Sequence, residues 1–245
     1  MITGTLVNVV AVVAGGVIGL GVSRLGRKNT THVSSAQNTH GQLSERVMKA
    51  FGLVVMAIGV RMIMEEHDVL SVVFCIALGT LIGELLDVEG AIERFGEWLK
   101  ERTGSSNATF VSAFLTSTVL FCVGAMAFVG SLNDGLKDEP DVLFVKSMMD
   151  FVSSILLSAT MGIGVLFSAV SVLVIQGAIS LGASQLVFLM NNPLYINGLT
   201  VVGGVMILGI GANVSGMAKI RVGNILPALL LIILVDAIMI AYKGT

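Results

Sequence analysis

VLFVKSMMDFVSSILLSATMGIGVLFSAVSVLVIQGAISL, residues 142–181, decides the fold class of this chain. The stretch is apolar over almost all of its 40 residues. One helix needs about 20 residues to cross the hydrocarbon core of a bilayer. The stretch therefore predicts a tight membrane hairpin that turns near Gly162 and Gly164. Two full crossings and a re-entrant hairpin would both satisfy this pattern.

Two charged residues interrupt the start of this stretch. Lys146 and Asp150 are four positions apart, so they lie on one face of a helix. A charge in lipid is costly unless it is paired or faces a cavity. We predict that Asp150, with Lys146, belongs to a substrate or ion pathway. The alternative is a structural ion pair that only lowers the cost of insertion.

The composition excludes a soluble globular protein. The chain of 245 residues is 55% hydrophobic and 12% charged, whereas soluble domains have roughly a quarter of charged residues. The net charge of -2 leaves no basic surface for nucleic acid. The hydrophobic composition makes the lipid bilayer the expected partner. Cys75 and Cys122 lie inside apolar runs, without a disulfide or zinc spacing. No metal or cofactor is expected.

Apolar windows of spanning length predict eight crossings in a single membrane domain, residues 1–245. The windows are residues 2–22, 47–64, 69–86, 109–132, 142–160, 162–183, 197–215 and 223–241. The first window is too long and too rich in glycine for a cleaved signal peptide. The predicted fold is thus an all-α polytopic membrane helix bundle.

The basic residues predict the orientation. Lys and Arg gather in a polar loop at 23–46, in 87–108 and in 216–222, whereas acidic clusters occupy 65–68 and 134–141. The positive-inside rule places the basic segments in the cytoplasm and both termini outside. Within 87–108, apolar residues recur at helical spacing and predict an interfacial helix at 90–102, anchored by Trp98.

A shift of 152 positions indicates an internal repeat. It pairs Gly52 with Gly204, Gly59 with Gly211, and Glu84 with Asp236. The first helix needs a shift of 161. The repeat units would be 2–86 and 162–241, linked by 87–161, and they would be antiparallel. Chance matches between apolar helices are the alternative. Inverted repeats are typical of secondary transporters, with the site near the midplane.

Four motifs carry a resemblance to a known family: GELLDVEG at 83–90, FCVGAMAFVGSLNDG at 121–135, GIGVLFSA at 162–169 and VGNILPALL at 222–230. Together they resemble the bacterial membrane protein family of the YqgA and YdfK type, defined by domain of unknown function 554. The resemblance covers nearly the whole chain. It implies a multi-pass protein of the bacterial inner (cytoplasmic) membrane, and it carries over no catalytic residues.

Four further residues join the predicted pathway: Glu84, Asp236, Asn8 and Asn213. The two carboxylates lie near helix ends, where reaching the interface is the favoured interpretation. The two amides fit interhelical hydrogen bonds, each worth about 1 kcal/mol. Asp134 follows an apolar window, and a solvated loop is favoured there over an outer vestibule.

The sequence does not predict an enzyme. His32, His40 and His67 all fall in predicted loops, so no intramembrane histidine is expected as a metal ligand or general base. Neither a Walker sequence nor a GxSxG nucleophile elbow is present.

The predicted function is that of a transporter or channel for a small solute or ion. The alternative is a non-transporting scaffold or regulator whose loop 23–46 and helix 90–102 contact a partner. A homo-oligomer is compatible with either function. A water-accessible polar cavity at Asp150 would favour transport, and a closed apolar bundle would favour the scaffold.

Overall fold

The computed structural model describes residues 2–28, 36–137, 139–190 and 192–243, which are helical almost throughout and contain no strand. The predicted all-α fold is confirmed. In chain order the helices are α1 (Thr3–Lys28), α2 (Ala36–Ile63), α3 (Val69–Leu86), α4 (Val88–Arg102), α5 (Phe110–Cys122), α6 (Ala125–Lys137), α7 (Asp141–Met161), α8 (Gly164–Leu181), α9 (Ala183–Leu186), the 3-10 helix η1 (Val187–Met190), α10 (Pro193–Val214), the 3-10 helix η2 (Val222–Ile225) and α11 (Pro227–Lys243).

Most of the predicted crossings correspond to helices of spanning length. Among the described residues, α1, α3, α7, α8, α10 and, with η2, α11 are long and apolar enough to cross a membrane. The α5–α6 pair adds a seventh span if it is counted as one. The predicted span 47–64 lies in α2, where Lys49 and Arg61 interrupt the apolar sequence. The count of six or seven is therefore close to the predicted eight.

The predicted hairpin is formed by α7 and α8. Gly162 ends α7 with a φ of +93°, in the region that favours glycine. A Cβ on Gly164 would lie 2.1 Å from the carbonyl oxygen of Phe110, so α8 begins in close contact with α5. Both helices are long enough to cross the membrane.

The prediction of a single unbroken helix at 109–132 is wrong. The helix is broken after Cys122, and α5 and α6 meet at an angle of 62°. Gly124 adopts a φ of +134° at the break, which a residue with a Cβ would adopt only with strain. The sequence contains 29 glycines, so the glycine at this position did not by itself indicate a break.

The helix directions indicate that α5 and α6 together cross once. Gly4 of α1 lies against Leu143, and Gly19, further along α1, lies against the carbonyl group of Ile155. α1 and α7 therefore run in the same direction. If α2 also crosses, as the span predicted at 47–64 requires, this direction calls for one further crossing between α3 and α7, and the count becomes eight. The α5–α6 pair supplies it as a broken span.

The predicted polar loop at 23–46 is largely helical where the structure describes it. α1 continues to Lys28 and α2 begins at Ala36, while residues 29–35 lie outside the described part. Apolar length predicts only the portion of a helix that lies in lipid, and polar residues such as Gln and Arg extend it readily. The amphipathic helix predicted at 90–102 is confirmed as α4.

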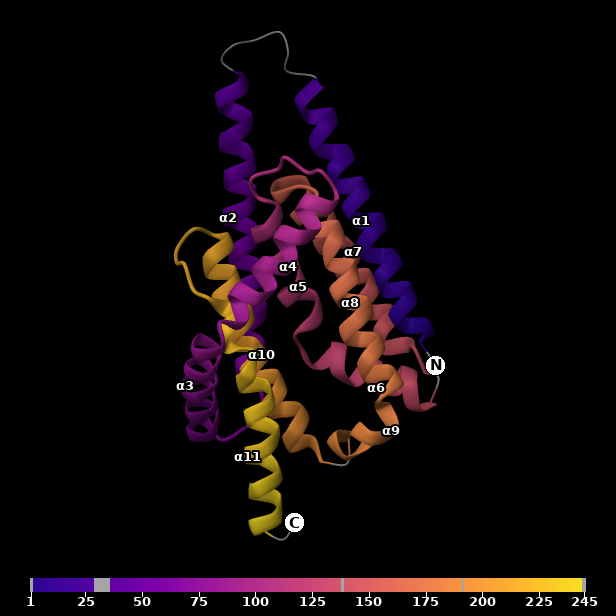
Figure 1. The fold of residues 1–245 in the computed structure, drawn as a ribbon, viewed down its shortest axis with the longest axis vertical. Helices are drawn as coiled ribbons and strands as arrows, with labels where there is room; N and C mark the ends of the chain where they lie inside the picture. The colour runs from indigo at the N-terminus through magenta and orange to yellow at the C-terminus, as the bar shows by residue number, and fades with distance from the viewer. Residues whose placement is uncertain (1, 29–35, 138, 191, 244–245) are drawn as a thin grey trace.

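Two antiparallel helix pairs pack closely through glycine (Figure 1). In the α2–α10 pair, Gly52 lies against the carbonyl group of Gly211, and Gly59 lies against that of Gly204. In the second pair, Gly79 of α3 lies against Ala228 of α11. Small residues let helix backbones approach in this way.

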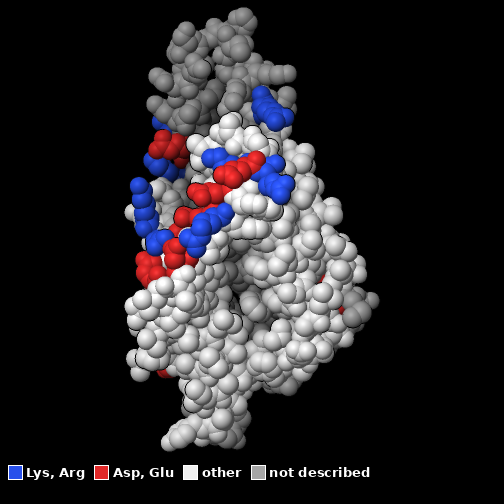
Figure 2. Space-filling view, in the orientation of Figure 1, with Lys and Arg blue, Asp and Glu red and all other residues white. Residues whose placement is uncertain are grey.

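Charged side chains gather at one end of the bundle, over α4 and the segment after α10 (Figure 2). Asp87 binds Arg94 at 2.8 Å and Arg221 at 3.1 Å. These ion pairs place the basic segments 87–108 and 216–222 side by side, as the orientation assignment requires. We call this the basic end and the other the opposite end.

We predict that Gly59→Ala destabilises the protein by about 1–3 kcal/mol, because overpacked contacts are costly. A Cβ at this position would lie 2.6 Å from the backbone nitrogen of Leu208. Gly21→Ala is the matched control, because no atom lies within 4 Å of its added Cβ. Thermal unfolding of both variants measures the difference. Equal melting temperatures would contradict the close α2–α10 contact.

We also predict that a cysteine replacing Lys219 is labelled only from the cytoplasm and one replacing Glu139 only from outside. Both positions are exposed, and the native Cys75 and Cys122 are buried and contribute little background. Membrane-impermeant thiol reagents applied to cells and to inverted vesicles give the measurement. Labelling of both positions from the same side would contradict the orientation.

Candidate functional site

The Lys146–Asp150 pair lies on the enclosed face of α7. Lys146 and Asp150 are only 6% and 7% exposed, and their charged groups form an ion pair. The spacing of four residues brings them together within α7 itself, so this contact was predictable from the sequence. Because both charges are buried, removal of either one would leave the other unpaired in the interior, at a cost in free energy.

Two buried amides extend this pair to neighbouring helices. Asn8 of α1 donates through Nδ2 to Asp150 Oδ2 at 3.0 Å and to Gln176 Oε1 of α8 at 3.2 Å. Both amide residues are fully buried. Asn8 Oδ1 and Gln176 Nε2 have no hydrogen-bond partner among the described residues. A free acceptor and a free donor therefore lie beside the ion pair.

The polar contacts continue toward the N-terminus of α1. The hydroxyls of Thr5 and Ser180 lie 3.4 Å apart, and Ser180 is one helical turn beyond Gln176. Asp134 of α6 is fully buried and accepts hydrogen bonds from the backbone N–H groups of Gly4 and Thr5, at 3.1 and 3.2 Å. A carboxylate is stabilised at a helix N-terminus in this way. The prediction that Asp134 lies in a solvated loop is therefore wrong.

Buried serines carry the polar face of α7 toward its other end. Ser154 donates to the carbonyl oxygen of Val12 at 2.7 Å. Ser158, one turn further, is fully buried, and its hydroxyl has no partner among the described residues. We call the whole set the polar line: Asp134, Thr5, Ser180, Gln176, Asn8, Asp150, Lys146, Ser154 and Ser158.

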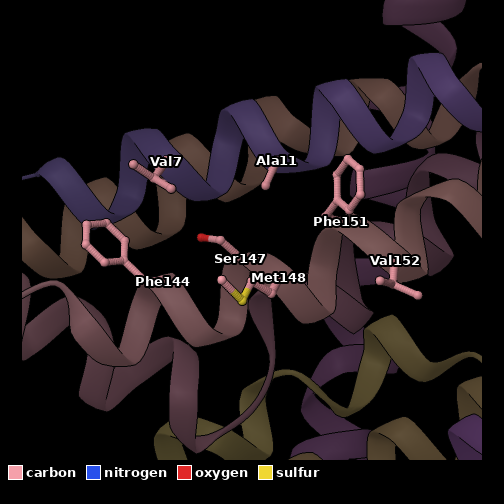
Figure 3. Close-up of a pocket in the computed structure, with 7 residues that line it drawn as sticks. All are labelled: Val7, Ala11, Phe144, Ser147, Met148, Phe151 and Val152. Atoms are coloured by element: carbon pink, nitrogen blue, oxygen red, sulfur yellow. The ribbon is translucent and has the colours of Figure 1, made fainter.

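A cavity beside α7 does not reach the charges of the polar line. It is an open groove of about 580 Å³ between α1 and α7. Figure 3 shows apolar side chains along it, with the hydroxyl of Ser147 as the polar exception. The groove matches a lipid chain better than a polar solute, and no charged side chain lines it.

A second polar cluster lies at the basic end. Arg221 binds Glu84 and Asp87, each at 3.1 Å, and Asn224 donates to Glu84. The Glu84 side chain is 52% exposed, and its interfacial position stays a prediction. Asn213 binds both backbone groups of Ile220, at 2.7 and 2.8 Å, and thereby holds the loop after α10.

This cluster borders a cavity of about 480 Å³, which is lined by residues of α2, α4, α5, α7 and α10 and of the segment after α10. Glu89, Glu93, Lys219 and Arg221 bring both signs of charge to its wall, and Asn213 lies among them. The cavity can therefore admit small polar or charged molecules at this end.

The charges at this cavity perturb one another. The hydrogen bond from Arg94 lowers the pKa of Asp87. Burial raises the pKa of Glu89, although its carboxylate accepts the N–H of Gly223 at 2.8 Å. The nearby Glu84 carboxylate raises the pKa of Arg221. Burial thus opposes the ionisation of Glu89.

The opposite end of α11 holds another buried acid. Asp236 is fully buried, and its Oδ1 lies 3.0 Å from Nε2 of His67. The prediction that the Asp236 side chain reaches the membrane interface is therefore wrong. His67 does lie in the loop before α3, as predicted, but its side chain is only 1% exposed. Spacing along the chain could not reveal a pair 169 residues apart.

The predicted pathway residues thus fall into three places. Lys146, Asp150 and Asn8 lie together in the polar line, Glu84 and Asn213 lie at the basic end, and Asp236 lies at the opposite end. Their role in a pathway stays a prediction. No group of three or more His, Cys, Asp or Glu suited to a metal ion occurs within the part of the chain that the structure describes.

Comparison with known proteins finds one family. Residues 3–237 match the family described as protein of unknown function DUF554. The chain is 30% identical to "Uncharacterized membrane protein YdfK" of Bacillus subtilis (strain 168), with 93% of each chain covered. It is 26% identical to "Uncharacterized protein YqgA" of Escherichia coli (strain K12), with 94% of each chain covered. No solved structure matches.

We predict that Glu89→Gln raises the melting temperature near neutral pH. Because burial raises the pKa of Glu89 in the folded protein, its stabilising contribution is present below the ordinary value of 4.5 and is lost as pH rises through the raised value. Each unit of the shift corresponds to about 1.4 kcal/mol. The increase in melting temperature that the neutral amide of Glu89→Gln provides should therefore disappear at acidic pH, where Glu89 of the wild-type protein is also neutral.

Melting temperatures of the variant and the wild-type protein across this pH range provide the test. Glu93→Gln, at an exposed position on the same helix, is the matched control and should show a smaller change. A Glu89→Gln protein that is less stable than wild type at neutral pH would contradict the prediction.

Proposed function

We propose that this chain, which belongs to the DUF554 family, is a multi-pass membrane transporter or channel for a small solute or ion. We place it in the bacterial cytoplasmic membrane, with the basic end toward the cytoplasm. The related protein of Bacillus subtilis is described as a membrane protein, and the described helices have the length and apolarity for insertion.

The polar line is the observation that carries this proposal. It crosses much of the α1–α7–α8 interface, in a region where every buried charge or unpaired polar group costs free energy. Packing alone would be served as well by apolar residues, as in the closed apolar bundle expected of a scaffold. The charged pair Lys146–Asp150 in its middle therefore supports a role in moving a polar species.

The unpaired atoms of the polar line indicate what it would accept. Asn8 Oδ1 can accept a hydrogen bond and Gln176 Nε2 can donate one. Asn8 binds Asp150 directly, and Gln176 binds Asn8. A small polar solute or a hydrated ion can supply both a donor for Asn8 Oδ1 and an acceptor for Gln176 Nε2. Asp150 lines neither of the two cavities described above and is only 7% exposed, so a solute would reach it only if α1, α7 and α8 moved apart.

The predicted inverted repeat is part of this proposal, and the helix packing supports it. The shift of 152 pairs Gly52 with Gly204 and Gly59 with Gly211. In space, Gly52 contacts Gly211 and Gly59 contacts Gly204. Each glycine thus meets the counterpart of the other, as a two-fold axis between α2 and α10 requires. Antiparallel repeats of this kind provide the two alternating states of many transporters.

We predict that Asp150→Asn abolishes solute or ion flux in liposomes. A working carboxylate is lost, whereas the amide keeps the shape of the side chain. If Asp150 served only to neutralise Lys146, the change would strand a buried cation and destabilise the protein by about 3–5 kcal/mol. The double change Lys146→Met with Asp150→Asn would then restore stability.

Flux of a panel of ions and small solutes and melting temperature are measured together for each variant. Asp141→Asn is the matched control, because Asp141 is exposed at the start of the same helix. Full flux in a folded Asp150→Asn protein would refute the role of this residue. The absence of flux for every species in the wild-type protein would favour the scaffold.

A further inference from the structure

His67 and Asp236 form a buried acid–base pair that the polar line does not use. His67 precedes α3, and Asp236 lies on α11, so the pair joins two elements at the opposite end. Asp236 Oδ2 has no hydrogen-bond partner among the described residues. Gly198 of α10 leaves room there, because an added Cβ would lie 2.6 Å from Oδ2 and 2.9 Å from His67 Nε2.

The hydrogen bonds around the imidazole imply a bound proton. His67 Nδ1 lies 3.3 Å from the backbone carbonyl oxygen of Asp68, which can only accept, so Nδ1 carries a hydrogen. The neutral ring then has a bare Nε2, which faces Asp236 Oδ1 at 3.0 Å. Both contacts are hydrogen bonds only when one more proton lies between Nε2 and Oδ1, on either atom.

Without this proton the pair carries a net charge of about -1 in a buried place, which is unfavourable. Among the described ion pairs, none joins a Lys or Arg to Asp236. From α3, Cys75 lies close enough to interact electrostatically with it. α10 contributes Gly198 beside it, and the adjoining loop carries the carboxylates of Glu65, Glu66 and Asp68.

The other end of the α3–α11 pair provides an internal comparison. Glu84 is the counterpart of Asp236 under the shift of 152, and it binds Arg221, which precedes η2 and α11. Each acid therefore meets a basic residue that precedes the partner helix. At the basic end this residue is an arginine, which is always charged. At the opposite end it is a histidine, which can release its proton.

We propose that His67 and Asp236 together bind one proton, taken up from the outer side of the membrane. Uptake converts the pair from a net charge of -1 to zero: the proton comes from water and is shared by Nε2 and Oδ1, and no other group is consumed. The use of this proton to drive transport rests on the proposed function. The binding of the proton does not.

The test is a histidine titration followed by nitrogen NMR. The protein, labelled with ¹⁵N-histidine and carrying His32→Gln and His40→Gln, is held in lipid nanodiscs so that His67 gives the imidazole signal. We expect one titration step at Nε2, with Nδ1 protonated on both sides of it. Asp236→Asn should lower the midpoint by about one pH unit or more, because an opposite charge is removed.

Glu84→Gln is the matched control and should leave the midpoint unchanged, because its acid lies at the other end of the same helix pair. If Asp236→Asn fails to fold, the titration of the unaltered pair still decides. A His67 signal that does not titrate while the protein stays folded overturns the proposal, and so does an equal midpoint in the folded Asp236→Asn protein.

A flux measurement separates this inference from the proposed function. Currents driven by a pH gradient are recorded in liposomes for the wild-type and Asp236→Asn proteins. A titrating pair in a protein without flux supports proton binding and contradicts transport. Flux in a protein whose His67 does not titrate supports transport and overturns the proton site.

Discussion

A carboxylate inside a bilayer has no water to solvate it, and this constraint organises the structure. Three fully or almost fully buried aspartates meet it in three ways. Asp134 accepts the first N–H groups of α1, Asp150 pairs with Lys146 and Asn8, and Asp236 contacts His67. Each solution ties the aspartate to another helix or loop. The buried acids therefore connect the bundle as much as its apolar contacts do.

Glycine makes these connections geometrically feasible. Gly15 and Gly19 bring α1 against the backbone of α7, where an added Cβ would lie 2.4 and 2.3 Å from carbonyl oxygens. At this separation the short side chain of Asn8 reaches Asp150 across the interface. A wider interface would leave the carboxylate with Lys146 alone. Close backbone packing and polar pairing thus depend on the same small residues.

The α3–α11 pair shows how one arrangement can carry two chemistries. An acid lies near the C-terminal part of each helix, and a basic residue precedes the partner helix. Arg221 keeps its charge at any physiological pH, whereas His67 is of the type that changes charge in that range. In the proposed transporter, one end would hold a permanent ion pair and the other a protonatable one.

The sequence by itself determined the features that depend on local spacing. The length of the apolar runs predicted the α7–α8 hairpin and most of the spans, and the helical repeat predicted α4. A separation of four residues predicted the contact between Lys146 and Asp150. These features follow from the thickness of a bilayer and the pitch of a helix, which act on neighbouring residues.

Only the tertiary structure decided which distant residues meet. The partners of Asp134 and Asp236 lie more than a hundred residues away, at separations of 130 and 169. The break at Gly124 likewise depends on a backbone conformation that glycine permits but does not require. Burial of a charged side chain is settled by the helices that surround it. A position near a helix end was therefore exposed for Glu84 and enclosed for Asp236.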